Sequence, residues 1–158
     1  NCYLRIDTIT DSMLRLLKKA GCHSLHLSVD SLSPYVREDI LNRKMNDVNL
    51  IQVLRKIHKH GIGTWVNFMT SVPGSSVLDD LNTFMFSKLA KITFPHFTNV
   101  VPMKKTELYD YCVEHDIDMD VNAGFYDVSC LSCFSPLSKA VRHNINRLGI
   151  VLNKLPLP

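Results

Sequence analysis

Polar side chains recur at every second position of four short, otherwise apolar segments, and they are the first candidates for chemistry. Residues two apart on a strand project from the same face of a sheet. A strand packed on both faces contains nearly continuous apolar residues instead. The pattern therefore predicts a cavity that holds a small-molecule ligand on one face. The row consists of Tyr3, Arg5, Asp7, His26, Ser28, Asp30, Trp65, Asn67, Met69, Ser71, Phe97 and Asn99.

Other interpretations of this row remain open. Arg5, Asp7 and Asp30 could satisfy one another in a purely structural network, or the alternation could mark a solvated antiparallel sheet. Regular intervening helices argue against the antiparallel sheet. A third alternative is a barrel enzyme with His26 and Asp30 as acid and base. On one strand they lie roughly 13 Å apart, which is long for direct cooperation.

Cysteine provides a weaker signal. Cys130 and Cys133 form a CxxC, the spacing of half a zinc site or of two ligands of an auxiliary iron-sulfur cluster. Two ligands are too few, and only His143 or a distant cysteine could complete the set. Free thiols are the favoured interpretation, with metal binding as the alternative.

Apolar periodicity predicts the elements that position these residues. Strands are expected over 2–7, 25–30, 64–72 and 97–102, each followed by a capped helical segment. One helix is expected from Asp47, and basic residues such as Arg142 are expected on solvated surface. The helix from Asp47 should bury Leu50, Leu54 and Ile57 on one face. Three other helices should also bury an apolar stripe. These stripes are Met13, Leu16, Leu17 and Ala20; Leu78, Leu81, Met85, Leu89 and Ile92; and Leu137, Val141, Ile145, Leu148 and Leu152.

Four βα units at about 31 residues each make a parallel sheet with helices outside, but not a closed eight-unit barrel. The predicted fold is therefore α/β, a partial (β/α) barrel over 1–118, with a loop and a helix over 119–158 packed on the same domain. Ligands of βα folds bind beyond the carboxyl ends of the strands. The residues expected there are Asp7, Asp30, Ser31, Ser71 and the turn 72–74.

Composition limits the classes of partner. The 158 residues are 46% hydrophobic and 21% charged, with a net charge of +3 and basic residues scattered along the chain. These values predict one globular domain that binds neither nucleic acid nor a membrane. Five dispersed cysteines fit the reducing cytoplasm. The apolar edge strand 2–6 should be covered by a missing N-terminal half-barrel or by another chain.

Four segments in this order resemble the second half of the radical S-adenosylmethionine (radical SAM) barrel, over about residues 2–118. The most similar subgroup often carries an N-terminal cobalamin-binding domain. The segments are LRIDTITDSMLRLLKKAGCHSLHLSVDS, LNRK, GIGTWVNFMTSVPGSS with Asp79 and Asp80 after it, and VPMKKTELYDYCVEHDID.

The resemblance implies an enzyme that binds S-adenosylmethionine (SAM) and a [4Fe-4S] cluster, cleaves SAM reductively and acts on a small-molecule substrate, in some members with cobalamin. The family's CxxxCxxC cluster motif is absent from this sequence, so its ligands are expected upstream. Ser71 and Ser75 replace the family's Gly and Glu. The alternative is a non-catalytic half-barrel that pairs with another chain. The implied cofactor-binding residues are Arg5, Ser28, Asp30, Ser31, Arg43, Asn67, Met69, Ser71, Pro73 and Gly74.

Overall fold

The computed structural model describes residues 1–45 and 48–156. Four parallel strands form one sheet in the order β1-β2-β3-β4. The strands are β1 Cys2–Tyr3, β2 Ser24–Asp30, β3 Gly63–Thr70 and β4 Phe94–Asn99. The helices are α1 Asp11–Lys19, α2 Leu50–Lys59, α3 Val77–Leu89, α4 Glu107–Glu114 and α5 Pro136–Lys154, with a 3₁₀ turn η1 Ile6–Thr8 and a π-helix η2 Tyr35–Ile40.

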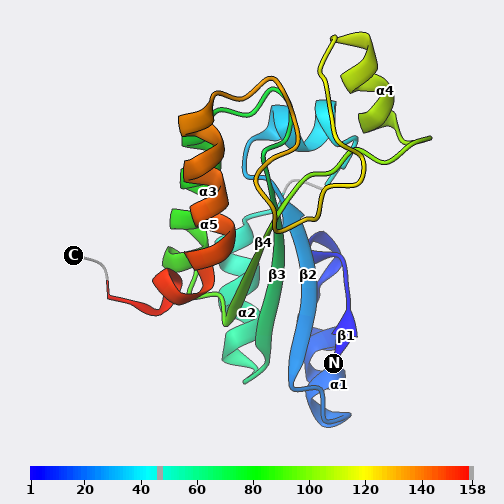
Figure 1. The fold of residues 1–158 in the computed structure, drawn as a ribbon. Helices are drawn as coiled ribbons and strands as arrows, with labels where there is room; N and C mark the ends of the chain where they lie inside the picture. Colours follow the sequence, from blue (N-terminus) through cyan, green and yellow to red (C-terminus); the bar gives the residue numbers. More distant parts are fainter. Residues whose placement is uncertain (46–47, 157–158) are drawn as a thin grey trace.

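The arrangement confirms the predicted α/β partial barrel. In Figure 1 the strands run upward, and α4 lies beyond their carboxyl ends, on the same side as η2. The helices α3 and α5 lie side by side next to β4. Each α-helix of the described residues begins at a side-chain cap; these caps are Thr10, Asn49, Ser76, Thr106 and Ser135.

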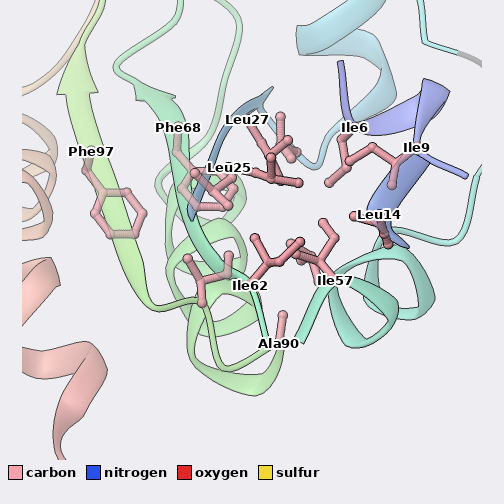
Figure 2. Packing of buried hydrophobic residues seen from close by; sticks show 14 of the residues in the cluster. Ile6, Ile9, Leu14, Leu25, Leu27, Ile57, Ile62, Phe68, Ala90 and Phe97 are labelled. Carbon is pink, nitrogen blue, oxygen red and sulfur yellow. The ribbon is translucent and has the colours of Figure 1, made fainter. Parts of the chain in front are cut away.

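One face of the sheet and the covering helices form the main core, as the alternation on β2 and β3 predicts. Leu25, Leu27 and Phe68 are buried between the sheet and these helices (Figure 2). Val66 belongs to the same cluster. Ile57 of α2 packs into the same cluster. The opposite face, named the concave face because the sheet is part of a barrel, carries the half-buried side chains of His26, Ser28, Trp65, Asn67 and Met69.

Two strand predictions were wrong. The first strand ends at Tyr3, because the chain turns into η1 instead of continuing to Asp7. β4 begins at Phe94, and its register pairs His96 with Asn67. Phe94, His96 and Thr98 therefore lie on the concave face, whereas Phe97 and Asn99 are buried on the helix side. Pro95, an unusual strand residue, concealed this start.

The predicted apolar stripe of α2 is confirmed, since Leu54 and Ile57 are buried. The stripes predicted for α1, α3 and α5 were largely wrong, although Ile92 and Ile145 are buried as expected. In α1 the fully buried residue is Leu14, while Leu16 is exposed. In α3 the predicted leucines face outward, and the buried residues are Asp80, Thr83 and Ser87. In α5 the buried residues are Arg142, Ile145, Asn146 and Gly149. The α3 face toward α5 is thus polar, because it pairs with Arg142. Asp47, the predicted helix start, lies outside the described residues.

None of the helices in the described part of the chain combines the length and the apolar character needed to cross a bilayer.

Close packing of α5 on β4 depends on Gly149. A Cβ atom built there lies 2.8 Å from Cδ2 of Phe97. Alanine normally stabilises a helix by about 1 kcal/mol relative to glycine. We expect Gly149→Ala to destabilise the protein by about 1–3 kcal/mol instead, because the added methyl overpacks the core. Urea denaturation measures this change.

The exposed Asn144→Ala substitution in the same helix is the matched control, and should leave stability unchanged or slightly raised. Phe97→Leu replaces the ring by a smaller side chain. It should lower the free energy of unfolding less in the Gly149→Ala variant than in the wild type. Additive effects of the two substitutions would contradict the packing described.

Candidate functional site

The carboxyl end of β2 carries a buried carboxylate with two partners. Asp30 is 3% exposed, adopts φ of 62° and follows a bulge in the ladder between β2 and β3. Ser28 Oγ donates to Asp30 Oδ1, and Arg43 Nε lies 2.6 Å from Oδ2. Aspartate tolerates the left-handed backbone better than most residues. The bulge therefore turns the Asp30 side chain toward Ser28 and Arg43.

A second ion pair lies at the end of β1. Arg5 donates to Asp7 through Nε and Nη2, at 3.1 and 2.8 Å. The Asp7 carboxylate thereby raises the pKa of Arg5 above its ordinary value. Arg5 Nη2 also donates to the Lys44 carbonyl at 2.9 Å, which ties the segment after η2 to the first strand.

The two ion pairs border a shallow pocket of about 440 Å³. Three cationic residues contribute to its walls, and the Arg43 side chain is 42% exposed. The pocket is therefore suited to an anionic group. Its lining consists of Arg5, Leu41, Asn42, Arg43 and Lys44.

Ser31 follows Asp30 directly, and its hydrogen bonds are to residues of the next segment of the chain. It is buried, its Oγ accepts from the Ser33 amide at 3.2 Å, and its carbonyl accepts from Arg37 Nη1 at 3.2 Å. These contacts anchor the entrance to η2. Ser31 thus holds the segment that leads to Arg43.

The turn after β3 has a strained start. Ser71 adopts φ of 59°, a conformation that favours glycine, and is fully buried. Its Oγ donates to Asn99 Oδ1 at 2.6 Å, which offsets part of the strain. The glycine that the resemblance implies at this position would adopt this backbone conformation without strain. The Ser71 side chain lies on the helix side of the sheet, with Asn99.

Pro73 and Gly74 form the tight turn that follows. The Ser75 amide donates to the Val72 carbonyl at 3.0 Å, and Gly74 has φ of 79°. A Cβ atom at Gly74 would lie 3.3 Å from Cε1 of Tyr35 in η2. The turn therefore packs closely against η2 above the sheet.

Asn67 and Met69 lie on the concave face of β3. Asn67 Oδ1 accepts from Trp65 Nε1 at 3.0 Å. Met69 packs against a second apolar cluster, which closes the carboxyl-end side of the sheet between η2 and α4. The buried members of this cluster are Val36, Ile40, Val72, Val100, Cys112 and Leu131.

Burial favours the neutral thiol form of Cys112, Cys130 and Cys133. Burial raises the pKa of Cys112 to about 11, and burial also raises the pKa values of Cys130 and Cys133. Within residues 1–45 and 48–156, no group of three or more His, Cys, Asp or Glu side chains could hold a metal ion. Cys130 and Cys133 therefore have no completed ligand set in that part of the chain.

The most heavily bonded side chain is Arg142, which we had expected on the surface. Arg142 Nε lies 2.5 Å from Asp80 Oδ2, and its Nη2 donates to the Ser75 carbonyl at 2.8 Å. The guanidinium carbon also lies 4.0 Å from the centroid of the Phe134 ring. Arg142 therefore connects α5 to α3, to the turn after β3 and to the loop before α5. No local sequence signal distinguishes it from a solvated arginine.

The structure thus gathers the predicted residues in two places. Arg5, Ser28, Asp30, Ser31 and Arg43 lie around the ends of β1 and β2. The others belong to β3 and its turn, with Asn67 and Met69 on the concave face, Pro73 and Gly74 above the sheet, and Ser71 on the helix side. Their roles in binding a cofactor stay predictions.

A parallel sheet with polar groups at the strand carboxyl ends is typical of βα folds, in which ligands bind at that edge. The sequence profile of the radical SAM superfamily matches residues 2–85, and this chain belongs to that superfamily. It is 22% identical over 118 residues to an uncharacterized methyltransferase from Pyrococcus horikoshii, which covers 75% of this chain and 26% of that protein.

Solved structures show the same fold. The radical SAM methyltransferase TsrM from Kitasatospora setae, with cobalamin and a [4Fe-4S] cluster bound, matches 90% of this chain with a TM-score of 0.63 and 14% identity. TsrM with tryptophan substrate and the SAM analogue aza-SAM bound matches with a TM-score of 0.59 and 15% identity. This chain covers 29% of each TsrM chain. It therefore spans between a quarter and a third of these proteins.

The buried pair of Arg142 and Asp80 generates a stability prediction. Arg142→Met leaves the Asp80 carboxylate buried without its cation, so we expect a loss of about 3–5 kcal/mol. Burial already raises the pKa of Asp80 although Arg142 lowers it. Because the folded variant binds a proton more readily than the unfolded chain, its stability should decline as pH rises from about 4, the unfolded pKa. Denaturant unfolding at several pH values measures both effects.

The matched control removes both charges. Asp80→Leu combined with Arg142→Met leaves no unpaired carboxylate, so the double variant should be more stable than Arg142→Met alone and should lose the added pH dependence. Equal stability of the single and double variants at neutral pH would contradict the ion pair.

Proposed function

We propose that this chain forms the SAM-binding part of a radical SAM enzyme, and that SAM binds in the pocket beside Asp30 and Arg43. The observation that carries this proposal is the buried Asp30 carboxylate paired with Arg43 at the edge of a cationic pocket, at the carboxyl end of β2. The superfamily match supports the same chemistry.

The residues present fit SAM. Its ribose hydroxyls are hydrogen-bond donors that suit a carboxylate such as Asp30, and its methionine carboxylate suits a guanidinium. Arg43 pairs with Asp30 through Nε, and its side chain is 42% exposed and contributes to the pocket lining. The volume of about 440 Å³ lies within the range of small-molecule sites.

The cluster does not fit these residues. Three thiolates hold the irons of a radical SAM [4Fe-4S] cluster, and the described part of the chain contains no suitable group of three ligands. We therefore place the cluster ligands outside this sequence, in a longer polypeptide or a second chain, and assign none of the electron transfer to the residues described.

The reaction class that we propose is transfer of a methyl group to a small-molecule substrate. The Pyrococcus relative and TsrM are both named methyltransferases, and TsrM binds cobalamin, which supports a cobalamin domain elsewhere in the complete protein. SAM supplies the activated methyl or adenosyl group when it is bound. Arg43 orients its carboxylate, Asp30 holds its ribose, and the second apolar cluster limits access of water to the pocket from the α4 side.

Binding of SAM tests this proposal directly. We expect the protein to bind radiolabelled SAM in equilibrium dialysis with a Kd below about 1 mM. Arg43→Ala should weaken binding by about tenfold or more, because it removes a charge-assisted bond to the SAM carboxylate and releases Asp30. Asp30→Asn should weaken binding as well.

The matched control is Arg55→Ala, which removes an exposed cation of α2 away from this pocket. It should bind SAM as tightly as the wild type. Circular dichroism verifies that each variant is folded. A wild-type protein that binds no SAM at millimolar concentration, or an Arg43→Ala variant with unchanged affinity, would refute the site.

We also propose that a preceding half-barrel or another chain covers β1. The alternative function, a non-catalytic half-barrel that pairs with another chain, would require a covered β1 as well. The Leu4 amide donates to the His26 carbonyl at 3.0 Å, so the neighbouring Tyr3 amide points away from β2, toward the open edge. In this chain alone the Tyr3 amide should exchange rapidly with deuterium. In the complete protein it should exchange at least about tenfold more slowly, and equal rates would contradict a covering strand.

A further inference from the structure

Three side chains on the concave face, one of them the implied cofactor-binding residue Asn67, form a continuous series of hydrogen bonds outside the lining of the pocket proposed for SAM. His96 Nδ1 lies 3.0 Å from Asn67 Oδ1, and His96 Nε2 lies 2.5 Å from the Tyr126 hydroxyl. The residues come from β4, β3 and the loop between α4 and α5. Their order is that of a hydroxyl, a base and a group that orients the base.

The loop holds Tyr126 in place through its neighbours. The Asn99 amide at the end of β4 donates to the Phe125 carbonyl at 2.9 Å, and Asn99 Nδ2 donates to the Asp127 carbonyl at 2.6 Å. The Gly124 amide donates to Asp127 Oδ2 at 2.8 Å. These bonds attach the loop to the free side of β4 on both sides of Tyr126.

Trp65 determines which atom donates and which accepts in each hydrogen bond of this series. An indole N–H can only donate, so the Asn67 atom 3.0 Å from Trp65 Nε1 is the amide oxygen. That oxygen can only accept, so His96 carries its proton on Nδ1. His96 Nε2 is then the acceptor and the Tyr126 hydroxyl is the donor.

The surroundings keep His96 neutral. The rings of Trp65 and Phe94 lie 5.6 and 6.5 Å from the imidazole, centroid to centroid, and neither carries a charge. Burial lowers the pKa of His96 below its ordinary value. Its Nε2 is therefore free of a proton at neutral pH and able to accept one.

We propose that Tyr126, His96 and Asn67 form an acid–base relay that exchanges a proton with an N–H or O–H group of the substrate. In one direction the substrate transfers its proton to Tyr126 Oη as the phenol proton moves to His96 Nε2. This step yields the deprotonated substrate and an imidazolium whose Nδ1–H remains bonded to Asn67. The reverse step restores all three groups, and no electron is exchanged.

The relay lies on the same sheet face as Ser28 and Met69, so a substrate that reaches it also faces the end of the sheet where we propose SAM. Its use on a substrate rests on the proposed function. Activation of the phenol by His96 depends only on the geometry, and it can be tested with neither SAM nor a cluster.

N-acetylimidazole is a suitable probe because it acetylates tyrosine hydroxyls. The Tyr126 oxygen attacks the acetyl carbon and forms an ester while the phenol proton passes to His96 Nε2. The acetyl C–N bond breaks, and the imidazolium returns this proton to the leaving nitrogen, so that neutral imidazole leaves and His96 is neutral again. Tyr3 is a control within the same chain, because it is 78% exposed whereas Tyr126 is 46% exposed. We expect Tyr126 to be acetylated on the order of tenfold faster than Tyr3 at pH 7.5, measured by peptide mass spectrometry.

His96→Gln should reduce the Tyr126 rate to that of Tyr3 or below, and Asn67→Ala should reduce it severalfold by freeing the imidazole. The Tyr3 rate should not change in either variant. Tyr126 reacting no faster than Tyr3, or an unchanged Tyr126 rate in folded His96→Gln, would overturn the relay. Loss of SAM binding with rapid acetylation retained would refute the proposed function alone.

Discussion

The ion pair of Arg142 with Asp80 is the interaction on which the arrangement of the second half of the chain depends. A buried carboxylate and guanidinium cost several kcal/mol of desolvation each, and only a complete set of partners offsets that cost. Arg142 obtains its partners from α3 and from the turn after β3, and packs on Phe134. The Ser71 amide lies 3.4 Å from the same Asp80 oxygen, so the strained start of that turn is fixed by the same charges. The helices and the turn are therefore positioned together.

The same constraint explains which features the sequence could predict. Strands β2 and β3 are packed by apolar side chains on one face, so the alternation of Leu27 and Val66 with Ser28 and Asn67 identified both faces correctly. The rule behind that success assumes that the apolar side of an element is the buried side. In α3 the buried side is polar because it serves Arg142, and the rule chose the opposite face. A pairing between residues 62 positions apart leaves no local periodicity from which to infer it.

The candidate sites differ in the same way. Asp30 ends a clear strand, and carboxyl ends of parallel strands collect ligand-binding groups, so its place could be predicted from the sequence. Arg43 and its pocket lie on a segment without regular structure, and only the family resemblance indicated them. His96 was missed because β4 was expected to begin after it. Tyr126 lies in a loop whose position is set by bonds to Asn99, a tertiary effect that composition cannot reveal.

The concave face combines two environments, one suited to binding a charged group and the other to transferring a proton. The pocket at the end of β2 is open and has cationic side chains in its lining, which suit the carboxylate group of the SAM that we propose there. Around His96 the neighbouring side chains are uncharged rings, and a proton there is governed by local hydrogen bonds. Asn67 lies between them in the register, opposite Ser28 on β2 and His96 on β4. A substrate held across this row would meet the cofactor at one end and the proton relay at the other, which separates binding of charge from transfer of protons.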